Sequence, residues 1–147
     1  MTMTSFIFDD GGRATAGYKG TTCDCVVRSI SIATGLPYQK VYADLNKLVK
    51  DSHQTKTARR SNSRSGMGRR FYQAYLESLG WEWVAIMKIG IGCKMHLRKD
   101  ELPKGRIIAR VSKHMVAVID GIIHDTFDPS RDGTRCVYGY FRKVQVL

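Results

Sequence analysis

Cys25 is the residue of this sequence that is best placed to act as a nucleophile. It lies where the sequence predicts the start of a helix from Cys25 to about Thr34, with Thr22 or Asp24 as its cap and Gly35 just beyond its end. A helix N-terminus carries a partial positive charge and free N–H groups, which favour thiolate over thiol. A thiolate can attack a carbonyl carbon, and the amide of Cys25 can help to hold the oxyanion that forms.

A hairpin in the second half of the chain supplies a base for such a thiolate. An Asp-Gly pair at 120–121 separates two apolar runs, 114–119 and 122–127, which is the pattern of a two-residue hairpin turn. With this turn, His114 opposes Phe127 and is the diagonal neighbour of Asp125 on the same face. The register therefore predicts His114 as the general base and Asp125 as the carboxylate that orients it.

The chain order of these three residues resembles that of the papain-like cysteine peptidases. The segments DCVVRSI at 24–30 and HMVAVIDG at 114–121 are similar to compact bacterial and phage members of that fold, and the runs at 75–83 and 120–140 resemble phage and prophage proteins without a known activity. The resemblance implies a thiolate–imidazolium pair of Cys25 and His114, oriented by Asp125, that acts on an amide or isopeptide carbonyl. It implies a phage-encoded cysteine hydrolase, a peptidase or amidase, which acts on a protein or peptide in the host cytoplasm without a cofactor.

The sequence departs from the papain-like pattern at the oxyanion hole. Papain-like enzymes usually carry a glutamine a few residues before the cysteine, whereas residues 18–24 here read YKGTTCD. Thr21, Thr22 and Lys19 are the side chains of this stretch that we expect to donate a hydrogen bond instead. Deamidases and transglutaminases use the same three catalytic residue types, so the reaction within this class stays open.

Other interpretations of the cysteines compete with the catalytic one. A cysteine at a helix start is often a small core residue. Cys23 precedes the predicted helix, so it is the weaker nucleophile and a candidate resolving or regulatory thiol. Cys23 and Cys25 together with Cys93 and His96 could bind zinc, but Cys-x-Cys spacing is tight for two ligands of one ion. We therefore expect no metal site.

A run of basic residues forms a second candidate site. Residues 50–70 hold seven basic side chains and one acidic one, which places +6 of the net charge of +11 in this segment. Its arginines are Arg59, Arg60, Arg64, Arg69 and Arg70. We expect a mobile loop at about 51–70 that contacts the phosphates of a nucleic acid or an acidic protein. The alternative function is accordingly a non-catalytic basic binding protein on the same fold. The aromatic side chains that follow, from Tyr72 to Trp83, have a spacing that favours core packing over base stacking.

The elements that must position these residues predict an α+β fold. Helices are expected at 25–34, 37–50 and 71–79, and strands at 5–8, 81–88, 107–111, 114–119, 122–127 and 138–146. Helices come first and strands follow, so we expect N-terminal helices packed on an antiparallel β-sheet, with the active cleft between the two. The length of 147 residues fits one papain-like domain over 1–147.

Composition limits the class of protein and its partners. A hydrophobic share of 43% can build a core, and 24 Lys and Arg against 13 Asp and Glu favour anionic partners. Four cysteines are too few for a secreted disulfide framework, so we expect free thiols in a reducing cytoplasm. The sequence has no apolar stretch of about 20 residues and no signal-peptide pattern, so no membrane partner is expected. The oligomeric state stays open.

Overall fold

Three helices lie on one face of a six-stranded sheet in the computed structural model, which describes residues 6–19, 23–52, 61–64 and 66–145. The sheet order is β1-β5-β4-β3-β6-β2. The strands, in chain order, are β1 (Phe6–Phe8), β2 (Trp81–Ala85), β3 (Arg106–Val111), β4 (His114–Ile119), β5 (Ile122–Asp125) and β6 (Gly139–Lys143). The predicted α+β class is confirmed, and the described strands are shorter at several ends than the sequence suggested.

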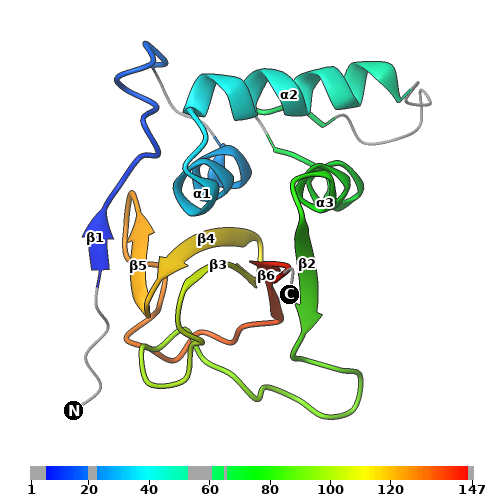
Figure 1. The fold of residues 1–147 in the computed structure, drawn as a ribbon. Helices are drawn as coiled ribbons and strands as arrows, with labels where there is room; N and C mark the ends of the chain where they lie inside the picture. Colours follow the sequence, from blue (N-terminus) through cyan, green and yellow to red (C-terminus); the bar gives the residue numbers. More distant parts are fainter. Residues whose placement is uncertain (1–5, 20–22, 53–60, 65, 146–147) are drawn as a thin grey trace.

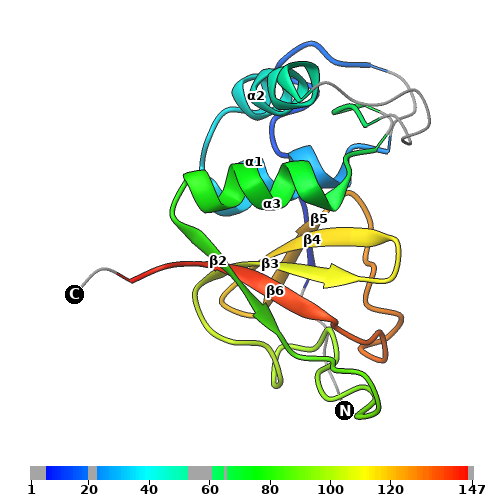
Figure 2. The same cartoon turned by 90° about the vertical axis from the view of Figure 1, so that its right-hand side faces the viewer.

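The helices form two levels above the sheet, as Figures 1 and 2 show. They are α1 (Cys25–Thr34), α2 (Tyr38–Asp51) and α3 (Arg69–Ser78). Helices α1 and α3 lie against the sheet, and α2 packs across both of them on the outer side. Because α1 is enclosed by β4, β3 and α2, most of its side chains are buried. It ends at Gly35, whose φ of 79° is the left-handed conformation that a glycine adopts without strain.

The expectation of an antiparallel sheet is wrong at one edge, because the sheet is mixed. Strand β1 pairs in parallel with β5, with Phe6 opposite Ile123 and Phe8 opposite Asp125. The other strand pairs are antiparallel. Local sequence patterns carry information about hairpins, but the pairing of β1 with β5 joins segments that lie more than a hundred residues apart along the chain. Its direction therefore depends on tertiary packing.

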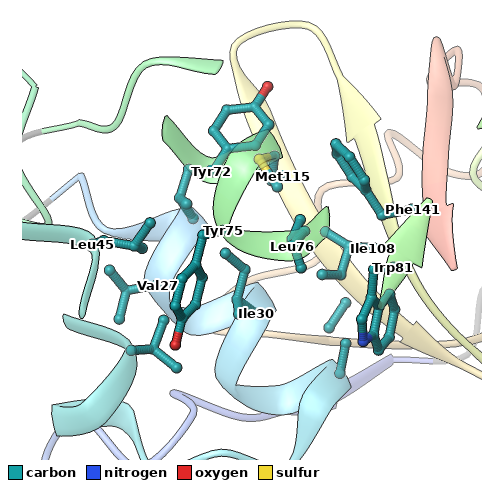
Figure 3. Close-up of a cluster of buried hydrophobic side chains, with 14 of the residues drawn as sticks. Val27, Ile30, Leu45, Tyr72, Tyr75, Leu76, Trp81, Ile108, Met115 and Phe141 are labelled. Atoms are coloured by element: carbon teal, nitrogen blue, oxygen red, sulfur yellow. The ribbon is translucent and has the colours of Figure 1, made fainter. Parts of the chain in front are cut away.

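Each face of the sheet has its own apolar core. The first core lies between the helices and the sheet and includes Val27, Ile30, Leu45, Leu76 and Phe141 (Figure 3). The second core lies on the opposite face, where the long connections at 86–105 and 126–138 cover side chains of β3, β4 and β5. These two cores fix β4 from both sides, so the strand that carries His114 has little freedom to move.

The expectation that all four cysteines stay as thiols is wrong for two of them. Cys93 and Cys136 form a disulfide with a Cα–Cα distance of 5.8 Å, and they are 43 residues apart in sequence. Both lie in the connections beneath the sheet, where an isolated β-bridge between His96 and Cys136 brings the two connections together. Cys23 and Cys25 are free.

None of the helices within the described residues has the length and apolarity needed to cross a bilayer.

Candidate active site

Cys25 is the first residue of α1, as the sequence predicted, and its side chain is half-buried. Burial acts to raise the pKa of this thiol, but four other influences lower it. These are a hydrogen bond with His114, the positive charge of that imidazole, the backbone N–H of Met115 and the charge of Arg28. Together they bring the pKa of Cys25 below its ordinary value, which favours the thiolate.

His114 is the first residue of β4 and is 8% exposed. Its Nε2 lies 2.6 Å from Oδ2 of Asp125, so Nδ1 is the ring nitrogen left for Cys25. Its ring also contacts that of Phe127, with 5.2 Å between the centroids. Burial acts to lower the pKa of His114, but the hydrogen bonds to Asp125 and Cys25 and the negative charges of both raise it to about 9. The imidazolium is therefore the stable form beside the thiolate.

Asp125 ends β5 and is buried, and the hairpin turn brings it to His114. Ile119 pairs with Ile122 and Val118 with Ile123, which is the predicted register. The turn residues Asp120 and Gly121 both have positive φ, at 51° and 80°, as a type I′ turn requires. Asp125 Oδ1 accepts the backbone N–H of Thr126 at 2.7 Å, which leaves Oδ2 for the imidazole. The structure thus brings Cys25, His114 and Asp125 into one chain of contacts.

A buried ionic network behind these residues was missed by the sequence analysis. Arg28 contacts Oδ1 of Asp24 one turn earlier on the chain, and its Nη2 lies 3.3 Å from Oδ1 of Asp125. The Tyr38 hydroxyl donates to Oδ2 of Asp24 at 2.5 Å, and Arg13 Nε lies 3.5 Å from the same oxygen. Arg28 therefore joins the start of α1 to the end of β5. The spacing of Asp24 and Arg28 at i and i+4 was the available signal.

This network also corrects the predicted helix cap. Asp24 occupies the N-cap position of α1, but its side chain makes no capping hydrogen bond. Its carboxylate bonds Arg28 and Tyr38 instead. The contact with Arg28 joins two charged groups, which makes it stronger than a hydrogen bond between neutral groups. Burial and the charge of Asp24 both raise the pKa of Tyr38, so the phenol keeps its proton and remains a donor.

The predicted oxyanion donors are only partly described. Thr21 and Thr22 lie outside the described residues. Lys19 is exposed, and its carbonyl oxygen accepts a hydrogen bond from Arg64 Nη2 at 3.1 Å. Cys23 is exposed and its backbone N–H donates to the carbonyl of Arg64 at 2.9 Å. The main-chain atoms of Lys19 and Cys23 are therefore both bonded to Arg64, the first to its side chain and the second to its backbone.

The basic run divides between described and undescribed residues. Arg59 and Arg60 lie outside the described residues, and Arg64 is exposed. Arg69 and Arg70 belong to the first turn of α3 rather than to a loop, because this helix begins two residues earlier than expected. Their guanidinium groups lie over aromatic rings of the protein itself, Arg69 over Trp83 at 4.5 Å and Arg70 over Phe71 at 4.9 Å.

The zinc interpretation loses a ligand, because the sulfur of Cys93 is bonded to Cys136. His96 Nε2 lies 3.7 Å from that sulfur, and His96 Nδ1 pairs with Glu101 at 3.1 Å. Across the described ranges of the chain, no three His, Cys, Asp or Glu side chains converge in a way that could hold a metal ion.

Comparisons of the chain with protein-family models, with curated proteins and with solved structures found no match.

Proposed function

We propose that this chain is a papain-like cysteine hydrolase that cleaves an amide bond of a protein or peptide. One observation carries the proposal: a half-buried thiol at a helix N-terminus contacts an imidazole whose other nitrogen lies 2.6 Å from a buried carboxylate. A nucleophile, a base and a group that orients the base are the parts that acyl transfer requires. The lowered pKa of Cys25 and the raised pKa of His114 support the same assignment.

In the first half of the reaction, the Cys25 thiolate attacks the carbonyl carbon of the amide. A C–S bond forms, and the electron pair of the C=O bond moves to the oxygen. When the C=O bond re-forms, the C–N bond breaks, and the His114 imidazolium gives its Nδ1 proton to the departing amine. The products of this step are a free amine, a thioester on Cys25 and a neutral imidazole.

In the second half, water enters in place of the amine. Nδ1 of His114 takes a proton from the water while its oxygen attacks the thioester carbon. The C–S bond then breaks, the acyl group leaves as a carboxylic acid, and the thiolate–imidazolium pair is restored. Asp125 holds Nε2–H throughout, so that Nδ1 is the nitrogen that gives and takes the proton. Arg28 Nη2, which lies 3.3 Å from Oδ1 of Asp125, helps to hold this carboxylate in place.

Segments 24–30 and 114–121 resemble compact bacterial and phage members of the papain-like fold, and the runs at 75–83 and 120–140 resemble phage and prophage proteins, which together support action in the cytoplasm of an infected host. Cytoplasmic thiol-reducing systems keep a nucleophilic cysteine reduced. The Cys93–Cys136 pair lies in the connections beneath the sheet, whereas the three catalytic side chains lie on α1, β4 and β5. Reduction of this disulfide would therefore leave the catalytic contacts in place.

Trapping of an acyl-enzyme tests the proposal without knowledge of the natural substrate. The protein is mixed with p-nitrophenyl acetate, quenched in acid and digested, and acetylated peptides are identified by mass spectrometry. We expect acetylation at Cys25 that disappears in Cys25→Ala and falls strongly in His114→Ala. Cys23→Ala is the matched control, because it removes a neighbouring exposed thiol and should leave acetylation of Cys25 intact. Acetylation of Cys23 in preference to Cys25 would contradict the proposal and would favour a basic binding protein instead.

A further inference from the structure

The Cys93–Cys136 disulfide has an imidazole beside its more exposed sulfur. Cys93 is exposed and Cys136 is partly buried, and Nε2 of His96 lies 3.7 Å from Sγ of Cys93. The connections that carry these residues lie on the face of the sheet opposite the helices (Figure 1). The proposed hydrolase reaction uses side chains of α1, β4 and β5, so it leaves this second contact of a sulfur with an imidazole without a function.

Glu101 determines which nitrogen of His96 faces the sulfur. Its Oε1 lies 3.1 Å from Nδ1 of His96 and accepts the backbone N–H of the same residue at 3.1 Å. Its Oε2 lies 3.3 Å from Nε of Arg98, which holds the carboxylate from the other side. A carboxylate accepts hydrogen bonds, so Nδ1 of the neutral imidazole carries the proton. Nε2 therefore faces Cys93 with a free lone pair, and it can take up a proton there.

Main-chain pairing holds the two cysteines together independently of the disulfide. His96 and Cys136 form a β-bridge, and backbone hydrogen bonds of 2.8 Å join segment 95–97 to segment 135–137 on either side of it. None of these contacts uses a sulfur atom. Opening of the disulfide therefore leaves the two cysteines side by side, and the bond can form again.

We infer that Cys93 is a site of thiol–disulfide exchange, at which His96 acts as the base for an attacking low-molecular-weight thiol. This activity goes beyond the proposed hydrolase function and does not depend on it. The exposure of Cys93 makes its sulfur the one that a thiol from solution reaches. The contact of 3.7 Å places Nε2 of His96 beside the point of attack.

In the first step, Nε2 of His96 takes the proton of the thiol, and the thiol sulfur attacks Sγ of Cys93. A new S–S bond forms to Cys93 and the bond to Cys136 breaks. Its electron pair passes to Sγ of Cys136, which takes a proton from water. The product is a mixed disulfide on Cys93 beside a free Cys136 thiol.

In the second step, another thiol attacks the external sulfur of the mixed disulfide. Cys93 leaves as a thiolate and takes the proton from Nε2 of His96. The second thiol gives its own proton to the solvent, which replaces the one that Cys136 took. Two external thiols are thus oxidised to their disulfide, and the protein disulfide is reduced by two electrons to two thiols.

Reduced glutathione is the probe that locates the attack. The protein is mixed with glutathione for short times at pH 7 and at pH 9.5, the reaction is stopped in acid, and free thiols are blocked with N-ethylmaleimide. Trypsin cleaves after Lys88, Lys94 and Arg135, so peptides 89–94 and 136–142 carry the two cysteines separately. We expect mass spectrometry to find the first glutathione adduct on Cys93.

His96→Gln tests the base. At pH 7 only about 3% of a thiol with a pKa of about 8.5 is thiolate, so a base speeds the attack, whereas at pH 9.5 the thiol is mostly ionised and needs none. We expect the adduct on Cys93 to form about 10-fold more slowly at pH 7 in this variant and at nearly the same rate at pH 9.5. His124→Gln is the matched control, because His124 also pairs with a carboxylate, that of Asp9, but belongs to β5, and it should leave both rates unchanged.

The His96→Gln variant should fold, because the β-bridge at this position is made by main-chain atoms. Equal slowing at both pH values would mean that His96 acts only on the shape of the disulfide, and an unchanged rate at pH 7 would mean that it takes no part. A first adduct on Cys136 would place the attack on the other sulfur. Each of these results overturns the inference, while the hydrolase proposal stands because it depends on Cys25.

Discussion

Replacing Cys25 with alanine should make the stability of the protein depend on pH between about pH 7 and about pH 9. The reason is a count of protons. In the thiolate–imidazolium pair that we propose, the folded protein holds one proton, on His114, whose pKa is raised to about 9. The unfolded chain also holds one, on the cysteine, because the ordinary values are 6.5 for histidine and 9.0 for cysteine. Because the folded and unfolded states bind the same number of protons on Cys25 and His114, this pair does not make the free energy of unfolding depend on pH.

Cys25→Ala removes that balance. The folded variant still holds a proton on His114, whose pKa Asp125 raises, while the unfolded variant loses its histidine proton above 6.5. The folded state then binds more protons, so the free energy of unfolding falls as pH rises, by at most about 1.4 kcal/mol per pH unit. A shift from 6.5 to about 9 corresponds to about 3 kcal/mol, and this is an upper bound because the variant lacks the contribution of the thiolate.

Urea unfolding at a series of pH values measures the effect. The free energy of unfolding of Cys25→Ala is subtracted from that of the unmodified protein at each pH. This subtraction cancels the pH-dependent contributions of the titratable groups that both proteins share. Cys23→Ala is the control and should follow the unmodified protein. In the double variant Cys25→Ala/Asp125→Asn the pH dependence should largely vanish, since its source is the carboxylate. Parallel profiles for Cys25→Ala and the unmodified protein would refute the coupled pair.

Three further predictions concern the structure that supports the site. Arg28→Met removes the guanidinium that contacts both Asp24 and Asp125, so the free energy of unfolding in urea should fall by about 3–5 kcal/mol. Lys47→Met is the control, because it breaks the exposed pair of Lys47 with Asp51 and should leave this free energy nearly unchanged. Equal effects of the two substitutions would contradict the account. Gly139→Ala places a Cβ 2.4 Å from Trp83 Cζ2, so overpacking should cost about 1–3 kcal/mol, visible as a lower Tm; an unchanged Tm would argue against this close approach. The Cys93–Cys136 disulfide closes a loop of 43 residues, so its reduction should lower the free energy of unfolding in urea by about 4 kcal/mol. Alkylation of Cys25 should keep its rate after reduction, and loss of that reactivity would show that the disulfide supports the site.

The parts of the site that sequence could predict are those set by local rules. The helix from Cys25 to Thr34 follows from a cap position, an apolar face and Gly35, and the structure has the same bounds. The hairpin register follows from the two turn residues, and it selected Asp125 correctly as the neighbour of His114. Both features depend on residues close together in the chain, which is why pattern reasoning reached them.

The parts that sequence could not predict depend on distant contacts. The parallel pairing of β1 with β5 and the Cys93–Cys136 disulfide each join segments that no local pattern relates. The sequence predicts Thr22 or Asp24 as a helix cap. Of the two partners that the Asp24 carboxylate has instead, Arg28 lies four residues on in the same helix, whereas Tyr38 reaches it only when α1 and α2 pack. The spacing of Tyr72 assigns it to the core. That assignment holds for its ring, but whether its hydroxyl finds a partner is decided by the tertiary structure.

The central claim is that Cys25 and His114 form a thiolate–imidazolium pair, and the pH dependence of alkylation tests it most directly. Each free cysteine is alkylated with iodoacetamide over a range of pH, and modification is measured peptide by peptide. The account predicts that Cys25 reacts rapidly well below the ordinary cysteine pKa of 9.0, that Cys23 does not, and that His114→Ala removes the reactivity of Cys25 at low pH. If Cys25 instead reacts with the same pH profile as Cys23, or if His114→Ala leaves its profile unchanged, the pair does not exist and the hydrolase proposal is contradicted.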